Sequence, residues 1–180
     1  NPYLSSGIQY GLSDGSATTV YPESDFSNSS IISGGSLIEV PYQPSVTITD
    51  LKQKDGSIGK VSIDRVSLSC KVYEGATDSS MSKGAGHYTS SGIYTGNIGL
   101  FGHNRGSHAY FAKLKNVKIG DIVEYKTAIG TKTYQVTFVG SISCTDYSYL
   151  NEMGDNRITL ITCIANQPSL RLCVQAVEIR

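Results

Sequence analysis

Residues 58–72, IGKVSIDRVSLSCKV, decide the fold. Apolar side chains stand at Ile58, Val61 and Ile63, and then at every second position from Val66 to Val72. Successive side chains of a β-strand point to opposite faces, so this alternation predicts strands with one buried face. The stretch therefore indicates a sheet that covers a core on one side.

The rest of the chain extends this β pattern. No repeat of 20–50 residues and no alternation of strands with long helices is visible, which argues against solenoids and parallel α/β folds. About eight short strands with one or two helical insertions predict an all-β fold, a closed or nearly closed eight-stranded barrel. The later strands are expected at 97–102, 122–127, 133–139, 158–162 and 170–179, and short helices at 77–83 and 109–115.

The first part of the chain has a different composition. Residues 1–35 are rich in Ser, Gly, Thr, Asn and Asp without a sustained period, which predicts a loop-like segment. Two short strand candidates, 37–40 and 46–49, have prolines beside them and are expected at edges or as extended coil. We therefore expect a loop-rich extension over residues 1–55, packed on or near the barrel, and a barrel domain over residues 56–180.

Composition limits the classes of function. The 180 residues carry a formal net charge of zero, so bulk charge does not favour binding to nucleic acid or to an anionic membrane. Many Gly and Tyr residues, no Trp and few charged residues are typical of a turn-rich extracellular domain. No stretch approaches the ~20 apolar residues that span a bilayer. The chain begins at Asn1, so we expect a shortened or processed product.

Four cysteines occur, at positions 70, 144, 163 and 173, and an even number in a surface protein allows disulfides. The chain has no C-x-x-C pair and three histidines, which argues against a zinc site. No acidic loop has the ligand spacing of a calcium site. We expect no metal and no cofactor. Cys70, Cys144 and Cys173 lie in strand-like apolar surroundings and are expected to be small buried side chains.

Three polar residues stand at the edges of expected strands. Cys163 ends the run TLITC, Arg171 opens the next apolar run, and His103 ends GLFGH. A thiolate that attacks a carbonyl, an imidazole that moves protons and a guanidinium that stabilises an oxyanion together suit acyl transfer. From the residues alone, Cys163 is equally consistent with a buried strand cysteine. Of the other histidines, His87 is expected to be structural and His108 to lie at the surface.

These residues also carry a family resemblance. TLITC, the GH of GLFGH and an arginine in the strand after the cysteine resemble the signature of the sortases, cysteine transpeptidases that attach proteins to the Gram-positive cell wall. Other segments fit the family in the same order and extend the resemblance over 56–180, leaving residues 1–55 without a family pattern. They are SIGKVSI (57–63), KVYEG (71–75), GAGHY (84–88), 114–121 and RLCVQA (171–176).

The resemblance implies a fold, a reaction and a site. It implies a closed eight-stranded sortase-type barrel in which Cys163 is the nucleophile, His103 the acid and base, and Arg171 the oxyanion or substrate clamp. The substrate would be an LPxTG-like sorting signal, cut after its threonine and held as a thioester. The acceptor would be an amine of a peptidoglycan precursor or of a pilin. The expected pocket residues are Thr162 and, in the loop 141–157, Tyr147, Tyr149, Leu150 and Met153.

The resemblance also implies a location. Sortases act at the outer face of the cell membrane, held by an anchor that this chain lacks, and a monomer is expected. The subclass stays open between a housekeeping and a class D-like enzyme. Pilus-building sortases often carry a lid with Asp, Pro and an aromatic residue in succession. This chain has Asp25-Phe26 without the proline, and we expect an ordinary loop there.

Two other readings remain at this stage. A thiol hydrolase would deliver the acyl group to water, and a barrel without catalysis would serve as a binding or adhesion module. Acceleration of turnover by an amine separates the first from a transpeptidase. Loss of covalent peptide capture in Cys163→Ala excludes the second.

Overall fold

The computed structural model describes residues 30–33, 36–39 and 45–179. The chain divides into two compact units, residues 1–44 and 45–180. In the first unit, β1 (Ser30–Ser33) pairs antiparallel with β2 (Ser36–Glu39). The prediction that 1–35 is loop throughout is therefore wrong at β1, where two β-branched isoleucines favour a strand. Asp25 and Phe26 lie outside the described residues.

The second unit begins with a helical turn, α1 (Ile48–Leu51), where the sequence predicted a short strand over 46–49. That prediction is wrong because Thr47 and Asp50 form a local cap. The Asp50 carboxylate accepts hydrogen bonds from Thr47 N at 2.8 Å and Thr47 Oγ1 at 2.7 Å. Leu51 is fully buried in the barrel core, so α1 packs with the barrel.

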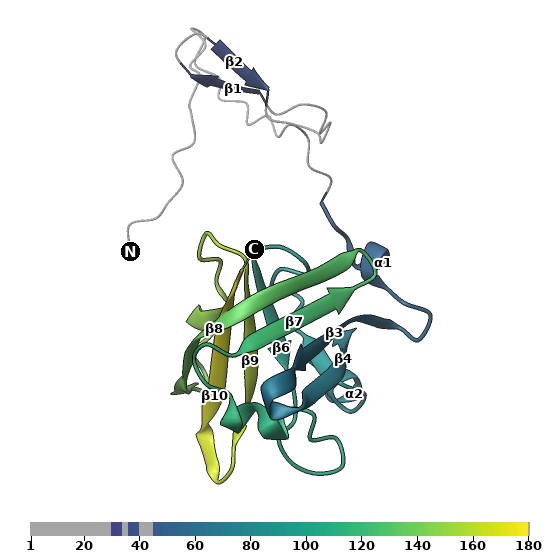
Figure 1. Ribbon diagram of the computed structural model, residues 1–180, viewed down its shortest axis with the longest axis vertical. Coiled ribbons are helices and arrows are strands. Elements are labelled where there is room, and N and C mark those ends of the chain that lie inside the picture. Colours follow the sequence, from purple (N-terminus) through teal and green to yellow (C-terminus); the bar gives the residue numbers. More distant parts are fainter. Residues whose placement is uncertain (1–29, 34–35, 40–44, 180) are drawn as a thin grey trace, which may run out of the picture. The chain divides into compact units, whose positions relative to one another are not determined.

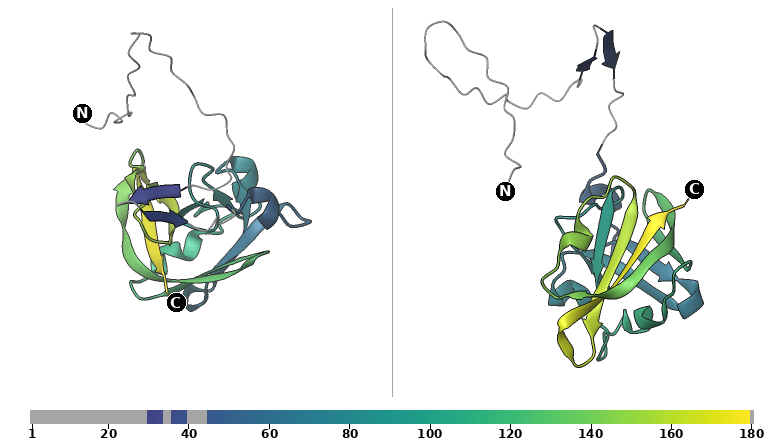
Figure 2. Two further views of the ribbon diagram at one scale, coloured as in Figure 1. Left: turned by 90° about the horizontal axis from the view of Figure 1, so that it is seen from above. Right: turned by 90° about the vertical axis from the view of Figure 1, so that its left-hand side faces the viewer.

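Eight strands close into the predicted barrel in the order β10, β8, β7, β3, β4, β5, β6, β9 (Figures 1 and 2). Neighbouring strands are antiparallel except β4 with β5 and β6 with β9, which run parallel. The strands are β3 (Ser57–Ile63), β4 (Leu68–Glu74), β5 (Ala85–His87), β6 (Asn97–Phe101), β7 (Ile122–Thr127), β8 (Gly130–Ser143), β9 (Arg157–Ile164) and β10 (Gln167–Glu178).

Short helical segments connect the strands. The alternating run of 58–72 is broken by η1 (Asp64–Val66), so it forms two strands joined by a turn. The expected helices are α2 (Asp78–Met81), capped by Thr77, and η2 (Ala112–Asn116). A further turn, η3 (Ser148–Leu150), lies between β8 and β9. Strand β8 is longer than the predicted 133–139 because its first half pairs with β7 and its second half with β10.

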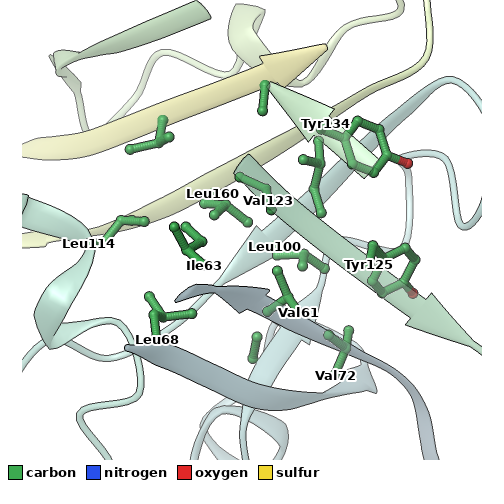
Figure 3. Close-up of a cluster of buried hydrophobic side chains, with 14 of the residues drawn as sticks. Val61, Ile63, Leu68, Val72, Leu100, Leu114, Val123, Tyr125, Tyr134 and Leu160 are labelled. Atoms are coloured by element: carbon green, nitrogen blue, oxygen red, sulfur yellow. The ribbon is translucent and has the colours of Figure 1, made fainter. Parts of the chain in front are cut away.

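The barrel interior is filled by alternate side chains of its strands (Figure 3). Strand β7 shows the period clearly, since Val123, Tyr125 and Thr127 are buried while the residues between them are exposed. Two of the four cysteines, Cys70 and Cys173, are buried as predicted, Cys144 is half-buried and Cys163 is exposed. All four lie within the described residues and none of them forms a disulfide.

Strands β6 and β9 are buried on both faces, unlike β7. Their inward side chains, such as Leu100 and Leu160, join the interior core. Their outward side chains lie under the connection between β8 and β9. A second apolar cluster forms on this outer face from Ile142, Leu150, Ile161 and Cys173, with Tyr88, Phe101, Phe138 and Tyr149 packed against it. We call it the outer cluster, and the candidate site lies at its edge.

Candidate active site

Three neighbouring strands, β6, β9 and β10, bring their outward side chains into rows. Phe101 lies opposite Ile161, and Ile161 lies opposite Cys173. Side chains directly opposite one another share one face of a sheet, and the face repeats every second residue. Two residues further along β9 and β10, Cys163 lies directly opposite Arg171. The pairing therefore puts the thiol and the guanidinium on the outer face, next to the outer cluster.

His103 continues the same pattern beyond the end of β6. It stands two residues after Phe101, as Cys163 stands two residues after Ile161, and Gly102 N donates to Ile161 O at 3.2 Å. The backbone thus stays beside β9 as far as the histidine. We call His103, Cys163 and Arg171 the site row. All three line one cavity of about 260 Å³, the first cavity.

Two side-chain hydrogen bonds hold the segment 102–104 against the end of β9. Thr162 Oγ1 donates to Gly102 O at 2.6 Å, and Asn104 Nδ2 donates to Cys163 O. Thr162 is buried, and its neighbour Cys163 is exposed, as expected for successive residues of a strand. The first bond holds the backbone of the residue before His103, and the second holds the backbone of Cys163. Together they fix the separation of His103 and Cys163.

Arg171 is anchored by its own turn. Its Nη1 donates to Pro168 O at 2.9 Å and to Leu170 O at 2.7 Å. Within the described part of the chain, its side-chain hydrogen bonds use Nη1 alone, so Nε and Nη2 have no partner there, and Arg171 lines the first cavity. A guanidinium held in this way presents N–H groups at a fixed position, a requirement for stabilising an oxyanion.

The first cavity is mainly apolar beyond the site row. Phe101, Ile142 and Ile161 line it from the outer cluster, and Met81 lines it from α2. Asp146 also lines it, and hydrogen bonds from the Ser148 hydroxyl and backbone N–H lower the pKa of its carboxyl below the usual value. The cavity therefore combines an apolar wall with one carboxylate and one guanidinium.

The pocket residues expected from the sequence take up different positions. Thr162 and Tyr147 line the first cavity, and the Tyr147 side chain is 56% exposed. Leu150 is buried in the outer cluster, and the Tyr149 ring stacks on Phe138 with centroids 5.2 Å apart. Met153 is 55% exposed and does not line the first cavity.

Several lining residues escaped the sequence analysis. Phe101 had a local signal, because it shares the two-residue period that leads to His103. Ile142 had none, because only the pairing of β8 with β10 puts it opposite Arg171. Cys144 reaches the same cavity from the end of β8 and was expected to be an ordinary buried residue.

A buried polar group anchors the loop that covers the outer cluster, and the sequence analysis missed it too. Asn97 Nδ2 donates to Tyr149 O at 2.9 Å and to Asn151 O at 2.8 Å. Gln175 Nε2 donates to Tyr149 O at 2.8 Å, and Thr159 Oγ1 donates to Asn97 Oδ1 at 2.8 Å. All three side chains are at least nine-tenths buried. They fix the loop between β8 and β9, whose residues Asp146 and Tyr147 line the first cavity.

The other histidines do not line the first cavity. His87 is fully buried, with Nδ1 at 2.8 Å from Glu74 Oε2 and Nε2 at 2.9 Å from Gly92 O. His108 is exposed. Among the described residues, no group of three or more His, Cys, Asp or Glu side chains is placed to hold a metal ion. No helix in those same ranges has the length and apolarity to cross a bilayer.

The family model described as the sortase domain matches residues 61–179. The chain belongs to the sortase family. The match includes every member of the site row. It also covers the barrel strands from within β3 to the end of β10.

Two curated sortases resemble the chain over most of its length. Sortase A of Bacillus anthracis is 29% identical over 132 residues, which cover 72% of this chain and 62% of that protein. Sortase A of Listeria monocytogenes is 27% identical over 170 residues, or 91% of this chain and 76% of that protein. The chain thus spans less than two thirds of the Bacillus relative.

Solved sortase structures share the barrel. The lid mutant of Streptococcus agalactiae Sortase C1 superposes with a TM-score of 0.67 at 26% identity, covering 72% of each chain. Group B Streptococcus Pilus Island 1 Sortase C2 gives the same TM-score at 26% identity, over 72% of this chain and 77% of that one. Sortase C-1 of Actinomyces oris, at 24% identity and a TM-score of 0.67, adds support for the fold.

Proposed function

We propose that this sortase is a cysteine transpeptidase that cuts an LPxTG-like sorting signal and transfers the acyl part to an amine. The observation that carries the proposal is the site row, in which Cys163 lies directly opposite Arg171 and shares the first cavity with Arg171 and His103. Family membership supports the same reaction class.

In the first half of the reaction, the Cys163 thiolate attacks the carbonyl carbon of the scissile peptide bond. The carbonyl oxygen becomes an oxyanion, and the free N–H groups of Arg171 stabilise it. The tetrahedral intermediate then breaks its C–N bond while His103 donates a proton to the leaving amine. The product is a thioester on Cys163.

In the second half, an acceptor amine attacks the thioester carbon. His103 takes a proton from that amine, a new C–N bond forms, and the C–S bond breaks to restore the thiolate of Cys163. Thr162 and Asn104 act as positioning residues, because their bonds hold the backbone on either side of His103 against β9.

The apolar lining of the first cavity supports an extended, largely apolar peptide as the donor substrate. Phe101, Ile142 and Ile161 would contact its apolar side chains, with Tyr147 at the exposed edge. The acceptor would be an amine of a peptidoglycan precursor or of a pilin, and the reaction would take place at the cell surface.

A direct test is incubation with a panel of LPxTG-type peptides with and without an amine acceptor. Mass spectrometry should show a thioacyl adduct on Cys163, and the amine should convert it to an amide product. Cys163→Ala should form no adduct. Cys144→Ala is the matched control, because it removes the other thiol of the same cavity and should retain the adduct.

Three outcomes would contradict the proposal. An adduct on Cys144, or unchanged peptide processing by Cys163→Ala, would show that Cys163 is not the nucleophile. Cleavage that no amine accelerates would indicate a thiol hydrolase. Reversible binding of the peptides without any adduct would indicate a binding module.

A further inference from the structure

A buried histidine outside the site row connects two parts of the barrel. His87 is fully buried at the end of β5, and both of its ring nitrogens have close partners. Nδ1 lies 2.8 Å from Glu74 Oε2 at the end of β4, and Nε2 lies 2.9 Å from Gly92 O and 3.2 Å from Ser91 Oγ. The ring therefore joins a barrel strand to the turn that follows β5, residues 88–92.

The partners of this ring decide where its protons are. Gly92 O is a carbonyl oxygen and can only accept a hydrogen bond. Ser91 Oγ donates its single proton to Tyr88 O at 2.6 Å, so it also acts as an acceptor toward Nε2. The carboxylate of Glu74 accepts at Nδ1. Because every partner is an acceptor, the contacts require a donor at both ring nitrogens, that is, an imidazolium ion paired with the carboxylate.

The same network fixes the residue next to His87. Tyr88 N donates to Gly99 O at 2.8 Å, and Tyr88 O accepts from the backbone and the hydroxyl of Ser91. Ser91 Oγ also accepts from Gly99 N at 2.9 Å, so the turn is held against β6. The backbone of Tyr88 is thus fixed by β6 on one side and by the histidine on the other.

The side chain of Tyr88 packs behind the wall of the first cavity. Its ring centroid lies 6.1 Å from that of Phe101 and 6.4 Å from that of Tyr147. Phe101 and Tyr147 line the first cavity, whereas Tyr88 does not. Tyr147 is largely exposed, so its position depends on the ring against which it stacks. Tyr88 is therefore placed to set the position of two side chains that the peptide would contact.

We propose that the ion pair of His87 and Glu74 positions the wall that receives the donor peptide. The pair holds the turn 88–92, the turn holds the Tyr88 ring, and the ring supports the two aromatic side chains of the wall. A buried ion pair often adds little stability over apolar side chains of similar volume, so its contribution here is geometric. The inference rests on the proposed function and adds three positioning residues that act through the wall of the first cavity.

Nitrogen NMR of the histidine ring tests the pairing without any substrate. In the unmodified protein at pH 7, Nδ1 and Nε2 of His87 should both have the shifts of protonated nitrogens, and His87→Gln identifies these signals by their loss. Glu74→Gln keeps a side-chain oxygen and removes the charge, and it should convert the ring to a form with one protonated nitrogen. A single N–H on the His87 ring of the unmodified protein would overturn the inference.

Single-turnover formation of the thioacyl adduct tests the consequence for the peptide. We expect Glu74→Gln and Tyr88→Leu each to raise the peptide concentration at half-maximal rate by about threefold to tenfold, because the wall loses its support. The maximal rate should change by less than about twofold, because the site row is not altered. The double variant should be no weaker than the weaker single variant, because both changes break the same connection. Glu124→Gln, at an exposed carboxylate of β7, is the matched control and should behave as the unmodified protein.

Two kinetic results would overturn the inference. They are an unchanged half-maximal concentration in both single variants, and additive effects in the double variant, which would indicate a general loosening of the fold. Thermal unfolding should show that each variant is folded at the assay temperature, and if Glu74→Gln is not, Tyr88→Leu and the ring shifts of the unmodified protein still decide. If the unmodified protein forms no adduct, the proposed function fails together with the role of the pair in peptide binding, and NMR still decides the pairing itself.

Discussion

At the scale of single residues, the site row depends on a few hydrogen bonds to backbone atoms. His103 lies beyond the end of β6, so the strand ladder does not hold it directly. The Thr162 hydroxyl and the Asn104 amide cross between the two chain segments and replace that ladder. The Arg171 guanidinium is fixed to its own turn through Nη1. We therefore expect activity to respond to side chains that never touch the reacting atoms.

Thr162→Val keeps the shape of the side chain and removes the donor to Gly102 O. We expect a loss of about 1–2 kcal/mol in the free energy of unfolding, since the buried carbonyl loses its partner. The rate of thioacyl formation should fall about tenfold with little change in KM for the peptide. Thr162→Ser retains the hydroxyl and should restore the rate. A Val variant as fast as the unmodified protein would contradict this positioning role.

Arg171→Lys retains the positive charge and removes the planar set of N–H donors. We expect thioacyl formation to slow by about 100-fold, because an ammonium ion cannot hold its turn and the oxyanion at once. Thermal unfolding should change little, since the residue is only half-buried. Single-turnover kinetics followed by mass spectrometry measure the effect. Near-normal rates would show that charge alone is sufficient.

At the scale of elements, the two-residue period of β6, β9 and β10 assigns a role to each row of outward side chains. The row of Phe101, Ile161 and Cys173 is apolar and supports the outer cluster. Two residues before Ile161 on β9, Thr159 lies opposite Gln175 of β10. These two side chains and that of Asn97 carry the polar groups that anchor the loop between β8 and β9. Two residues after Ile161 on β9, the next row carries Cys163 and Arg171. A single sheet face thus combines an anchor, an apolar wall and the proposed chemistry.

Asn97→Ala removes the donor to two loop carbonyls and the acceptor for Thr159. We expect a loss of about 1–3 kcal/mol for each buried group left unpaired. Hydrogen exchange should accelerate in residues 144–156, and KM for the peptide should rise several-fold because the loop lines the first cavity. Gln135→Ala, an exposed amide on β8, is the control and should change neither quantity. Unchanged exchange in the loop would contradict the anchoring role.

At the scale of the whole molecule, two thiols are buried on different sides of the barrel wall. Cys70 belongs to the interior core and Cys173 to the outer cluster. Burial raises the pKa of each thiol to about 12 from a usual value of 9.0. The unfolded chain therefore releases these protons at lower pH than the folded one. The stability linked to the thiols is complete below about pH 9 and is lost as pH rises toward 12.

We expect the free energy of unfolding to fall between pH 8 and pH 10. Above the pKa of the thiols in the unfolded chain, the fall approaches about 1.4 kcal/mol per thiol for each pH unit. Urea unfolding at a series of pH values measures the slope. Cys70→Ala and Cys173→Ala should each flatten it, even though each lowers stability at pH 8 by leaving a small cavity. Cys163→Ala, at an exposed position, serves as the control. Equal slopes for all four proteins would refute the linkage.

The extent of prediction from the sequence can be followed through particular elements. The alternation in 58–72 predicted β3 and β4, and residues 122–127 were predicted with the bounds of β7. The strand expected at 46–49 is instead the turn of α1. The hydrogen bonds between Thr47 and Asp50 outweigh the strand propensity of their neighbours Val46 and Ile48. Local hydrogen bonds of this kind are decided by geometry that a hydropathy pattern does not contain.

The sequence by itself determined the barrel strands other than the short β5, the family signature and the identity of the three site-row residues as candidates. It could do so because the period of apolar side chains and a short motif are local properties. Only the tertiary structure decided that Ile142 and Cys144 reach the same cavity as Cys163 and that Asn97 anchors a loop more than fifty residues away. These facts follow from strand pairing between distant segments, which spacing along the chain does not encode.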